Sequence, residues 1–270
     1  MQDLPNFSDF NTKTKKLAAP SRDSKDENES LGLKQKYANG ISPFKFLSSV
    51  KEFVNLPEAE LIALADKARF ETYEMGSYIA TEGASEGMCG FILASGSIAM
   101  TKSSINGKEL IVELLQGGDI FGLMLTLAIK KLPIQMSARA LQKSSVLWVP
   151  IKNLNNLARN YPEILPEIIA HLIICLQSSY RLSRGLAHDR VEVRIAAILS
   201  SLSLKFSDPA AAKTLTLSFT RQQIADLTGT TIETCIRVTR AMQRDGLIDI
   251  SRPGVIRITN LRELNDLAEA

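Results

Sequence analysis

The sequence has few of the residues that metal centres, disulfide frameworks and many catalytic sites require. Its 270 residues include three cysteines and two histidines. Cys89, Cys175 and Cys235 lie far apart and show no Cys-x-x-Cys spacing, which argues against a structural zinc site or a disulfide framework. A nucleophile elbow, a Walker loop and a paired-carboxylate motif are all missing, so we do not expect an enzyme.

Long hydrophobic runs and a strong net charge are missing as well. No apolar segment approaches the length that crosses a bilayer, and no signal peptide precedes the first domain, so we expect a cytoplasmic protein without a membrane partner. The net charge is only +3, so nucleic-acid binding would have to come from a local basic patch. A chain of 270 residues with 45% hydrophobic residues can bury two modest cores, which favours two domains.

Residues 218–244 carry the clearest functional pattern. Ile224, Ala225 and Leu227 form an apolar stripe that predicts a first helix, and Gly229 follows where the turn needs positive φ. Thr231 suits the N-cap of a second helix over 231–244. The pattern is typical of a helix-turn-helix, whose second helix enters the major groove of DNA.

The second helix has two different faces. Cys235, Val238, Ala241 and Met242 recur at three- and four-residue spacing and form an inward face. The residues of the opposite face are predicted to read base edges, because arginine can bind guanine, a carboxylate can accept from cytosine and apolar groups can contact a thymine methyl. They are Glu233, Arg237, Ile232 and Ile236. A solvated surface helix with an ordinary charge pair is the alternative.

Other polar residues around these helices suit contacts with phosphates, which fix the register of a protein on DNA without reading sequence. They are Thr220, Arg221, Gln222, Thr231, Thr234, Arg240 and Arg252. Arg252 belongs to the turn Arg252-Pro253-Gly254 between two short runs of alternating apolar residues, 245–250 and 255–258. These runs predict a β-hairpin, the wing of a winged-helix domain.

From about residue 41 onward the chain resembles the Crp-Fnr family of bacterial transcription regulators. The strongest matches are residues 220–225, the cluster 231–234 with Arg237, and residues 191–199. The resemblance implies a DNA-binding regulator in which Glu233 and Arg237 read a TGA-type core of a palindromic half-site. It also implies binding to double-stranded DNA as a homodimer, with RNA polymerase as a further partner.

Residues 41–150 change to short strands separated by glycines, which predicts a compact all-β domain. The glycine-containing segments 96–98, 106–109 and 118–122 resemble the cyclic-nucleotide-binding jelly roll of the same family. The full expectation is an α+β fold with an N-terminal β jelly roll, a long dimerisation helix and a C-terminal winged helix-turn-helix. We expect domains at 41–150, 151–188 and 189–263, after a disordered extension at 1–40.

The effector of the sensor domain is not evident. A cyclic nucleotide needs a carboxylate for its ribose and an arginine for its phosphate, but the family positions hold Leu123 and the segment 134–136. A phosphate among such apolar side chains would be unpaired, so cyclic AMP is not expected. The residues of the candidate effector pocket are Gly122, Leu123, Met136 and Ser179.

Relatives in the resembled family carry an iron–sulfur cluster or haem. The first forty residues contain no cysteine, which argues against the N-terminal iron–sulfur cluster of oxygen-sensing relatives. Haem at His171 remains open, although a packed or solvated histidine is the alternative and the sequence suggests no second ligand. Cys175 is either a thiol switch or an inert helix cysteine.

A long helix is predicted from Tyr161 to about Leu186, and Pro166 falls in its first turn. Its apolar residues alternate steps of four and three, which favours a parallel dimer seam. The seam residues are Leu165, Ile169, Leu172, Leu176, Ser179, Ser183 and Leu186. The principal alternative for the whole chain is a ligand-sensing or protein-interaction module with degenerate DNA contacts, which the apolar Ile232 and Ile236 would explain.

Overall fold

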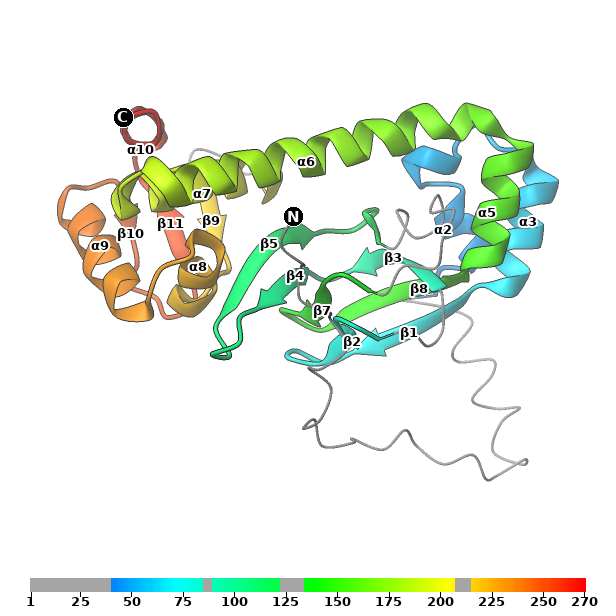
Figure 1. Ribbon diagram of the computed structural model, residues 1–270, viewed down its shortest axis with the longest axis horizontal. Coiled ribbons are helices and arrows are strands. Elements are labelled where there is room, and N and C mark those ends of the chain that lie inside the picture. The colour runs from blue at the N-terminus through cyan, green and yellow to red at the C-terminus, as the bar shows by residue number, and fades with distance from the viewer. Residues whose placement is uncertain (1–39, 85–88, 122–133, 207–214) are drawn as a thin grey trace, which may run out of the picture. The chain divides into compact units, whose positions relative to one another are not determined.

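The computed structural model describes residues 40–84, 89–121, 134–206 and 215–270 (Figure 1). The extension predicted for 1–40 lies outside the described residues apart from Gly40, and so do Gly122 and Leu123 of the candidate effector pocket.

Two four-stranded antiparallel sheets form the sensor domain (Figure 1). The first sheet has the order β1 (Arg69–Tyr73), β8 (Ser144–Pro150), β3 (Cys89–Ser95) and β6 (Ile120–Phe121). The second has the order β2 (Tyr78–Ala80), β7 (Ser137–Ala140), β4 (Ile98–Ser103) and β5 (Glu109–Leu115). Apart from β4 and β5, neighbouring strands in these sheets are not consecutive in sequence, which is typical of a jelly roll and not of a simple meander.

The sheets pack face to face because their strands alternate in side-chain direction. Phe91 and Leu93 of β3 are buried in a cluster between the sheets, together with Ile98 and Met100 of β4. Ile92, between them in sequence, points to the opposite face and joins a second cluster. This period of two is the signature of a strand buried on both faces. The two packed sheets and their strand order confirm the predicted β jelly roll.

Helices cover the outer face of the first sheet. They are α2 (Pro43–Leu47), η2 (Lys51–Phe53), α3 (Glu58–Lys67), α5 (Ile151–Asn160) and η3 (Pro162–Ile164). Their apolar residues, including Leu47, Phe53 and Leu154, pack with Phe70 and Leu147 of the sheet. Burying them removes the apolar side of the sheet from water.

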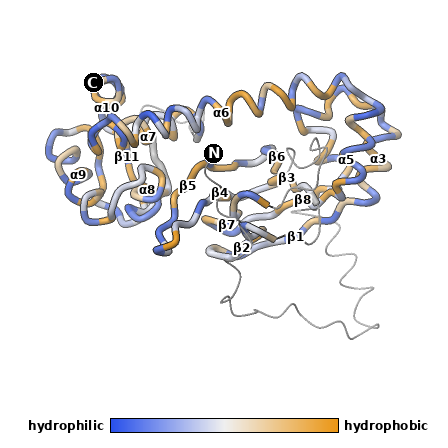
Figure 2. The backbone as a smooth tube through the Cα atoms, viewed as in Figure 1, coloured by the Kyte–Doolittle hydropathy of each residue, from blue (hydrophilic) through white to orange (hydrophobic). Residues whose placement is uncertain are grey.

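The long helix α6 runs from Leu165 to His188, and apolar residues colour much of it in Figure 2. Pro166 lies in its first turn and does not interrupt it, because the amide that proline lacks has no helical acceptor there. Among the described helices, α6 included, none is both long and apolar enough to cross a membrane.

The apolar surface of α6 differs in part from the predicted seam. Leu165 and Leu172 are half-buried against the core of their own domain. The large apolar side chains that stay exposed on one face follow steps of four and three: Ile169, Ile173, Leu176 and Tyr180, with exposed fractions of 51%, 49%, 50% and 65%. This exposed stripe shares Ile169 and Leu176 with the predicted seam.

The C-terminal part is a helical domain with a small sheet. Its elements are α7 (Val191–Phe206), β9 (Leu215–Leu217), α8 (Arg221–Thr228), α9 (Ile232–Arg244), β10 (Ile248–Asp249), β11 (Ile256–Ile258) and α10 (Leu261–Ala268). Strands β10 and β11 pair as an antiparallel hairpin, and β9 adds on the free side of β11. The hairpin confirms the wing that the sequence predicts.

The family-like segment 191–199 has a structural explanation. Arg194 on α7 donates from Nε to the Thr228 carbonyl at the end of α8 (3.0 Å), and from Nη1 to the Asp189 carbonyl (3.2 Å). Ile195 and Leu199 on the same helix are fully buried in the core of the domain. Helix α7 therefore fixes α8 by packing and by satisfying its carboxyl end.

The outer face of the second sensor sheet contacts the C-terminal domain. Ala99, Ile111 and Leu114 belong to the same buried cluster as the helix-turn-helix core, and β5 contacts both α6 and α8. Lys205 of α7 donates to the Leu114 carbonyl and forms an ion pair with Asp119 at 3.3 Å.

Candidate nucleic-acid interface

Side-chain caps define both helices of the helix-turn-helix. The Thr220 hydroxyl accepts from the Gln223 amide (3.2 Å), and the Gln223 side chain accepts from the Thr220 amide (2.7 Å). This reciprocal capping box starts α8. Gly229 ends the helix with φ of 61°, and Thr231 caps α9 by accepting from the Thr234 amide (3.3 Å). The turn and the N-cap were both predicted from sequence.

The inward face of α9 anchors the helix. Cys235, Val238 and Met242 are buried in the domain core, as their spacing predicts. Thr239 is also fully buried, and sequence reasoning missed it. Its hydroxyl is compatible with burial because it donates to the Cys235 carbonyl at 2.8 Å. Burial raises the pKa of the Cys235 thiol to about 11, so it stays neutral in the core.

The outward face of α9 is exposed and mainly cationic. Glu233, Arg237 and Arg240 are exposed, whereas Ile232 and Ile236 are half-buried. An open hollow of about 400 Å³ is lined by Glu233, Ile236, Arg237, Arg240 and Arg244. The structure thus brings most of the predicted base-reading residues onto one surface.

Arg244 belongs to this surface, although the sequence analysis did not include it. Its signal was present, because Arg237, Arg240 and Arg244 are three and four residues apart and so share a helix face. A row of guanidinium groups on one exposed face suits a polyanion, since each can pair with a phosphate or a base edge.

Glu233 lies in the first turn of α9. Hydrogen bonds from its own backbone amide and from the Thr231 hydroxyl lower the pKa of the Glu233 carboxyl below its usual value. A free amide at a helix N-terminus favours a negative charge for the same reason. Glu233 is therefore an ionised hydrogen-bond acceptor at neutral pH.

The predicted phosphate-contacting residues differ in how free they are. Arg252 is exposed in the wing turn. Gln222 donates to the Asp226 carboxylate (2.7 Å), and Arg221 is half-buried and donates to the Ile250 carbonyl (3.4 Å). Thr220, Thr231 and Thr234 lie at the helix N-termini, where hydroxyls and backbone amides can face a phosphate together.

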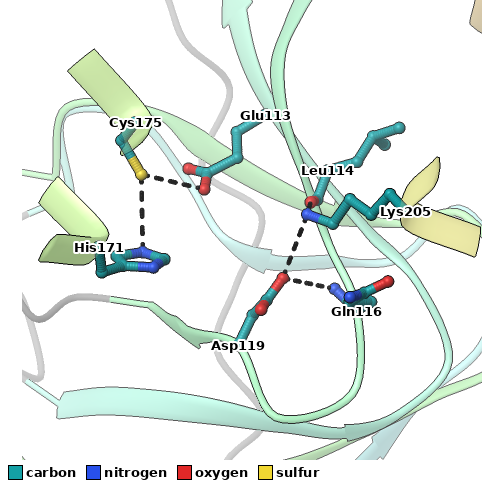
Figure 3. Close-up of polar contacts among 7 residues, drawn as sticks. All are labelled: Glu113, Leu114, Gln116, Asp119, His171, Cys175 and Lys205. Carbon is teal, nitrogen blue, oxygen red and sulfur yellow. Dashed lines mark hydrogen bonds and ion pairs between the residues drawn. The ribbon is translucent and has the colours of Figure 1, made fainter. Parts of the chain in front are cut away.

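The candidate effector pocket is only partly described. Met136 packs against the cluster between the two sheets, and the exposed Ser179 donates to the Cys175 carbonyl (3.0 Å). The structure instead assembles a cluster that the sequence analysis missed, in which Glu113 of β5 faces His171 and Cys175 of α6 (Figure 3). The histidine thus has two potential co-ligands nearby.

Comparison with known protein families defines the class of protein. Residues 70–161 match the cyclic nucleotide-binding domain, and residues 193–267 match the Crp-like helix-turn-helix domain. The matches cover the jelly roll and the winged helix described above. The chain is a transcription regulator with a sensor domain of the cyclic-nucleotide-binding type and a DNA-binding helix-turn-helix domain.

Similar proteins give the family. The chain is 30% identical to Electron transport regulator A of Shewanella oneidensis over 179 residues, 66% of this chain and 70% of that protein. It is 28% identical to Regulatory protein HlyX of Actinobacillus pleuropneumoniae, over 59% of this chain and 66% of that one. The fold is similar to that of FixK2 from Bradyrhizobium japonicum, with a TM-score of 0.66 and 21% identity over 75% of this chain and 98% of that one. The chain belongs to the Crp-Fnr family of regulators.

Proposed function

We propose that this regulator binds a palindromic operator as a homodimer, with α9 of each protomer in the major groove. Glu233 and Arg237 hydrogen-bond base edges in each half-site, and Ile232 and Ile236 contact thymine methyl groups. Arg240, Arg244 and the wing residue Arg252 bind phosphates beside the groove. The observation that carries the proposal is the exposed cationic face of α9, where Glu233, Arg237 and Arg240 surround one hollow.

The exposed stripe of α6 supports the dimer. Ile169, Ile173, Leu176 and Tyr180 leave a continuous apolar face in water, and a second copy of the same helix would cover it. Two-fold pairing puts two α9 helices on one side of the DNA, about one helical turn apart, which requires a palindromic site.

The other parts of the chain have proposed roles consistent with this. Residues 41–150 sense an effector, 151–188 pair the protomers, and 189–263 with the rest of α10 bind DNA. RNA polymerase is the further partner, the protein acts in the cytoplasm, and it has no catalytic activity. Cyclic AMP is not the proposed effector, because the family positions for its ribose and phosphate hold Leu123 and the segment 134–136.

Selection of bound sequences from a random DNA pool tests the function. The full chain should enrich a two-fold symmetric site, and it should bind that site with steep salt dependence. Arg237→Ala should cost about 1–3 kcal/mol per half-site on the selected sequence and little on random DNA, because it removes base reading and not phosphate attraction.

Arg262→Ala is the matched control, since it removes the same charge from an exposed position on α10. It should leave site preference unchanged. Equal losses on selected and random DNA for Arg237→Ala would contradict the assigned role. Failure to enrich any sequence would favour the alternative of an interaction module whose DNA contacts have degenerated, for which the apolar Ile232 and Ile236 are the motivation.

A further inference from the structure

The cluster of Glu113, His171 and Cys175 lies where the long helix crosses the second sensor sheet. His171 and Cys175 are four residues apart on α6, so one turn of helix places their side chains on the same face. Glu113, on the neighbouring strand β5, points its carboxylate at the Cys175 sulfur, which also contacts the His171 ring (Figure 3). All three residues are half-buried and thus within reach of solvent ions.

The distances between the donor atoms match those of a coordination sphere. Cys175 Sγ lies 3.3 Å from Glu113 Oε1 and 3.6 Å from His171 Nε2, and the three ligand atoms lie within 4.8 Å of one another. In a tetrahedral zinc site, metal–ligand bonds of about 2.0–2.3 Å place neighbouring ligand atoms about 3.5 Å apart. The three side chains therefore need little rearrangement to share one ion.

We propose that Glu113, His171 and Cys175 bind one Zn²⁺ ion per protomer, with water in the fourth position. Thiolate, imidazole and carboxylate are the ligand types that zinc takes in proteins. On binding, the sulfur–zinc bond replaces the S–H bond, and the proton goes to solvent. No electron is transferred, and the zinc charge is balanced by the thiolate and the carboxylate.

The charge of the Glu113 carboxylate also favours a cation at this site. None of the ion pairs formed among the described residues includes Glu113. The Cys175 thiol donates a hydrogen bond to Glu113 Oε1 at 3.3 Å. A divalent cation compensates a half-buried carboxylate better than a thiol does, because it supplies opposite charge.

The site would also tie α6 to the surface that meets the DNA-binding domain. Leu114, next to Glu113, accepts a hydrogen bond from Lys205 of α7, and Figure 3 shows the two sets of contacts side by side. A metal on Glu113 would hold β5 against α6 directly beside this contact.

Titration with Co²⁺ tests the proposal, because cobalt takes the same tetrahedral ligands and is coloured. The full-length protein, reduced and stripped of metal, should bind one Co²⁺ per protomer with a thiolate-to-cobalt absorption band. Equimolar Zn²⁺ should displace it, because a thiolate ligand in a tetrahedral site selects zinc. A wild-type protein without this band, or with a band that zinc leaves in place, would refute the site.

Three single variants assign the ligands. Cys175→Ser should abolish the sulfur band, and His171→Gln and Glu113→Gln should each weaken Zn²⁺ binding by at least about tenfold, since even second-shell changes cost about 10–100-fold. His188→Gln, at the other end of α6, is the matched control and should bind as the wild type does. A sulfur band that survives Cys175→Ser would assign the metal to another cysteine and overturn the proposal.

Alkylation of the wild-type protein gives a measurement that does not depend on how the variants fold. Zn²⁺ should protect Cys175 from iodoacetamide, as mapped by mass spectrometry, because a metal-bound thiolate is shielded. Alkylation of Cys175 at the same rate with and without Zn²⁺ would count against the proposal as decisively as the missing cobalt band.

Discussion

On α9, the residues of the candidate DNA-binding surface come from one helix, whereas the Glu113, His171 and Cys175 cluster joins a strand to a helix far away in the sequence. The spacing of residues along a helix is enough to place the α9 side chains on one face. The cluster, in contrast, forms only because β5 packs against α6. The arrangement of side chains on α9 should therefore survive changes in the sensor half, while the Glu113, His171 and Cys175 cluster should be lost when the packing of β5 on α6 is disturbed.

The largest effect is expected at the proposed dimer contact, because pairing brings two DNA-binding surfaces to one operator. Leu176→Glu places a charge in the centre of the exposed apolar stripe of α6 and should yield monomers. Single half-site binding then replaces paired binding, and affinity for the selected site should fall by about a thousandfold or more, toward the non-specific level. Sedimentation and gel-shift titration measure the two effects.

Ile174→Glu is the matched control, since Ile174 is exposed on the same helix but off the stripe. It should leave the dimer and the DNA affinity unchanged. A dimeric Leu176→Glu protein would show that the protomers pair through another surface.

The difference between the halves also explains what the sequence could predict. The jelly-roll arrangement of the sensor strands was implied by the family resemblance. The short strands themselves, the long helix, the Gly229 turn, the Thr231 cap and the wing follow from periodicity or from residues with special backbone preferences. These are local properties, and the structure agrees with each of them.

Features that depend on tertiary contacts were missed. The hydroxyl of Thr239 has a local acceptor in the Cys235 carbonyl, but its burial depends on how α9 packs on the rest of the domain. The half-burial of Leu165 and Leu172 against their own domain shifts the exposed stripe of α6. The spacing of His171 and Cys175 was visible in the sequence, but Glu113 was not, because no short-range pattern links β5 to α6.

The turn between α8 and α9 gives the next largest effect, since it joins local backbone geometry to a tertiary contact. Gly229 has φ of 61°, and an added Cβ would lie 2.6 Å from Cδ2 of Leu186 at the end of α6. Gly229→Ala should destabilise the protein by about 1–3 kcal/mol from backbone strain, plus the cost of moving Leu186. Urea denaturation measures the loss.

Gly246→Ala separates the two contributions. Gly246 also has positive φ, at 74°, but no atom of the described residues lies within 4 Å of an added Cβ. It should show the backbone strain alone and so a smaller loss than Gly229→Ala. Equal losses for the two variants would indicate that Leu186 does not approach the turn in solution.

Arg240 tests the candidate DNA-binding surface of α9 by itself. Arg240→Ala removes an exposed cation next to the proposed base-reading residues. Binding to selected and random DNA should weaken alike by several-fold, and the slope of log affinity against log salt should fall by about one per half-site. Salt titrations of gel-shift affinity give the slope, with Arg262→Ala as control. An unchanged slope would remove Arg240 from the phosphate contacts.

The smallest effect is expected where the two halves touch. Lys205 pairs with Asp119 at 3.3 Å and also donates to the Leu114 carbonyl, and both charged side chains are partly exposed. An exposed ion pair of this kind contributes about 0.2–1 kcal/mol to the free energy of unfolding, because solvent screens it.

A double-mutant cycle of Lys205→Met and Asp119→Asn isolates the coupling between the two side chains from the other contacts of either residue. Urea denaturation of the four proteins should give a coupling within this range that shrinks at high salt. Zero coupling at low salt would mean that the sensor sheet and α7 do not meet through this pair in solution, and the two halves would then be linked through α6 and the apolar contacts of Ile111 and Leu114.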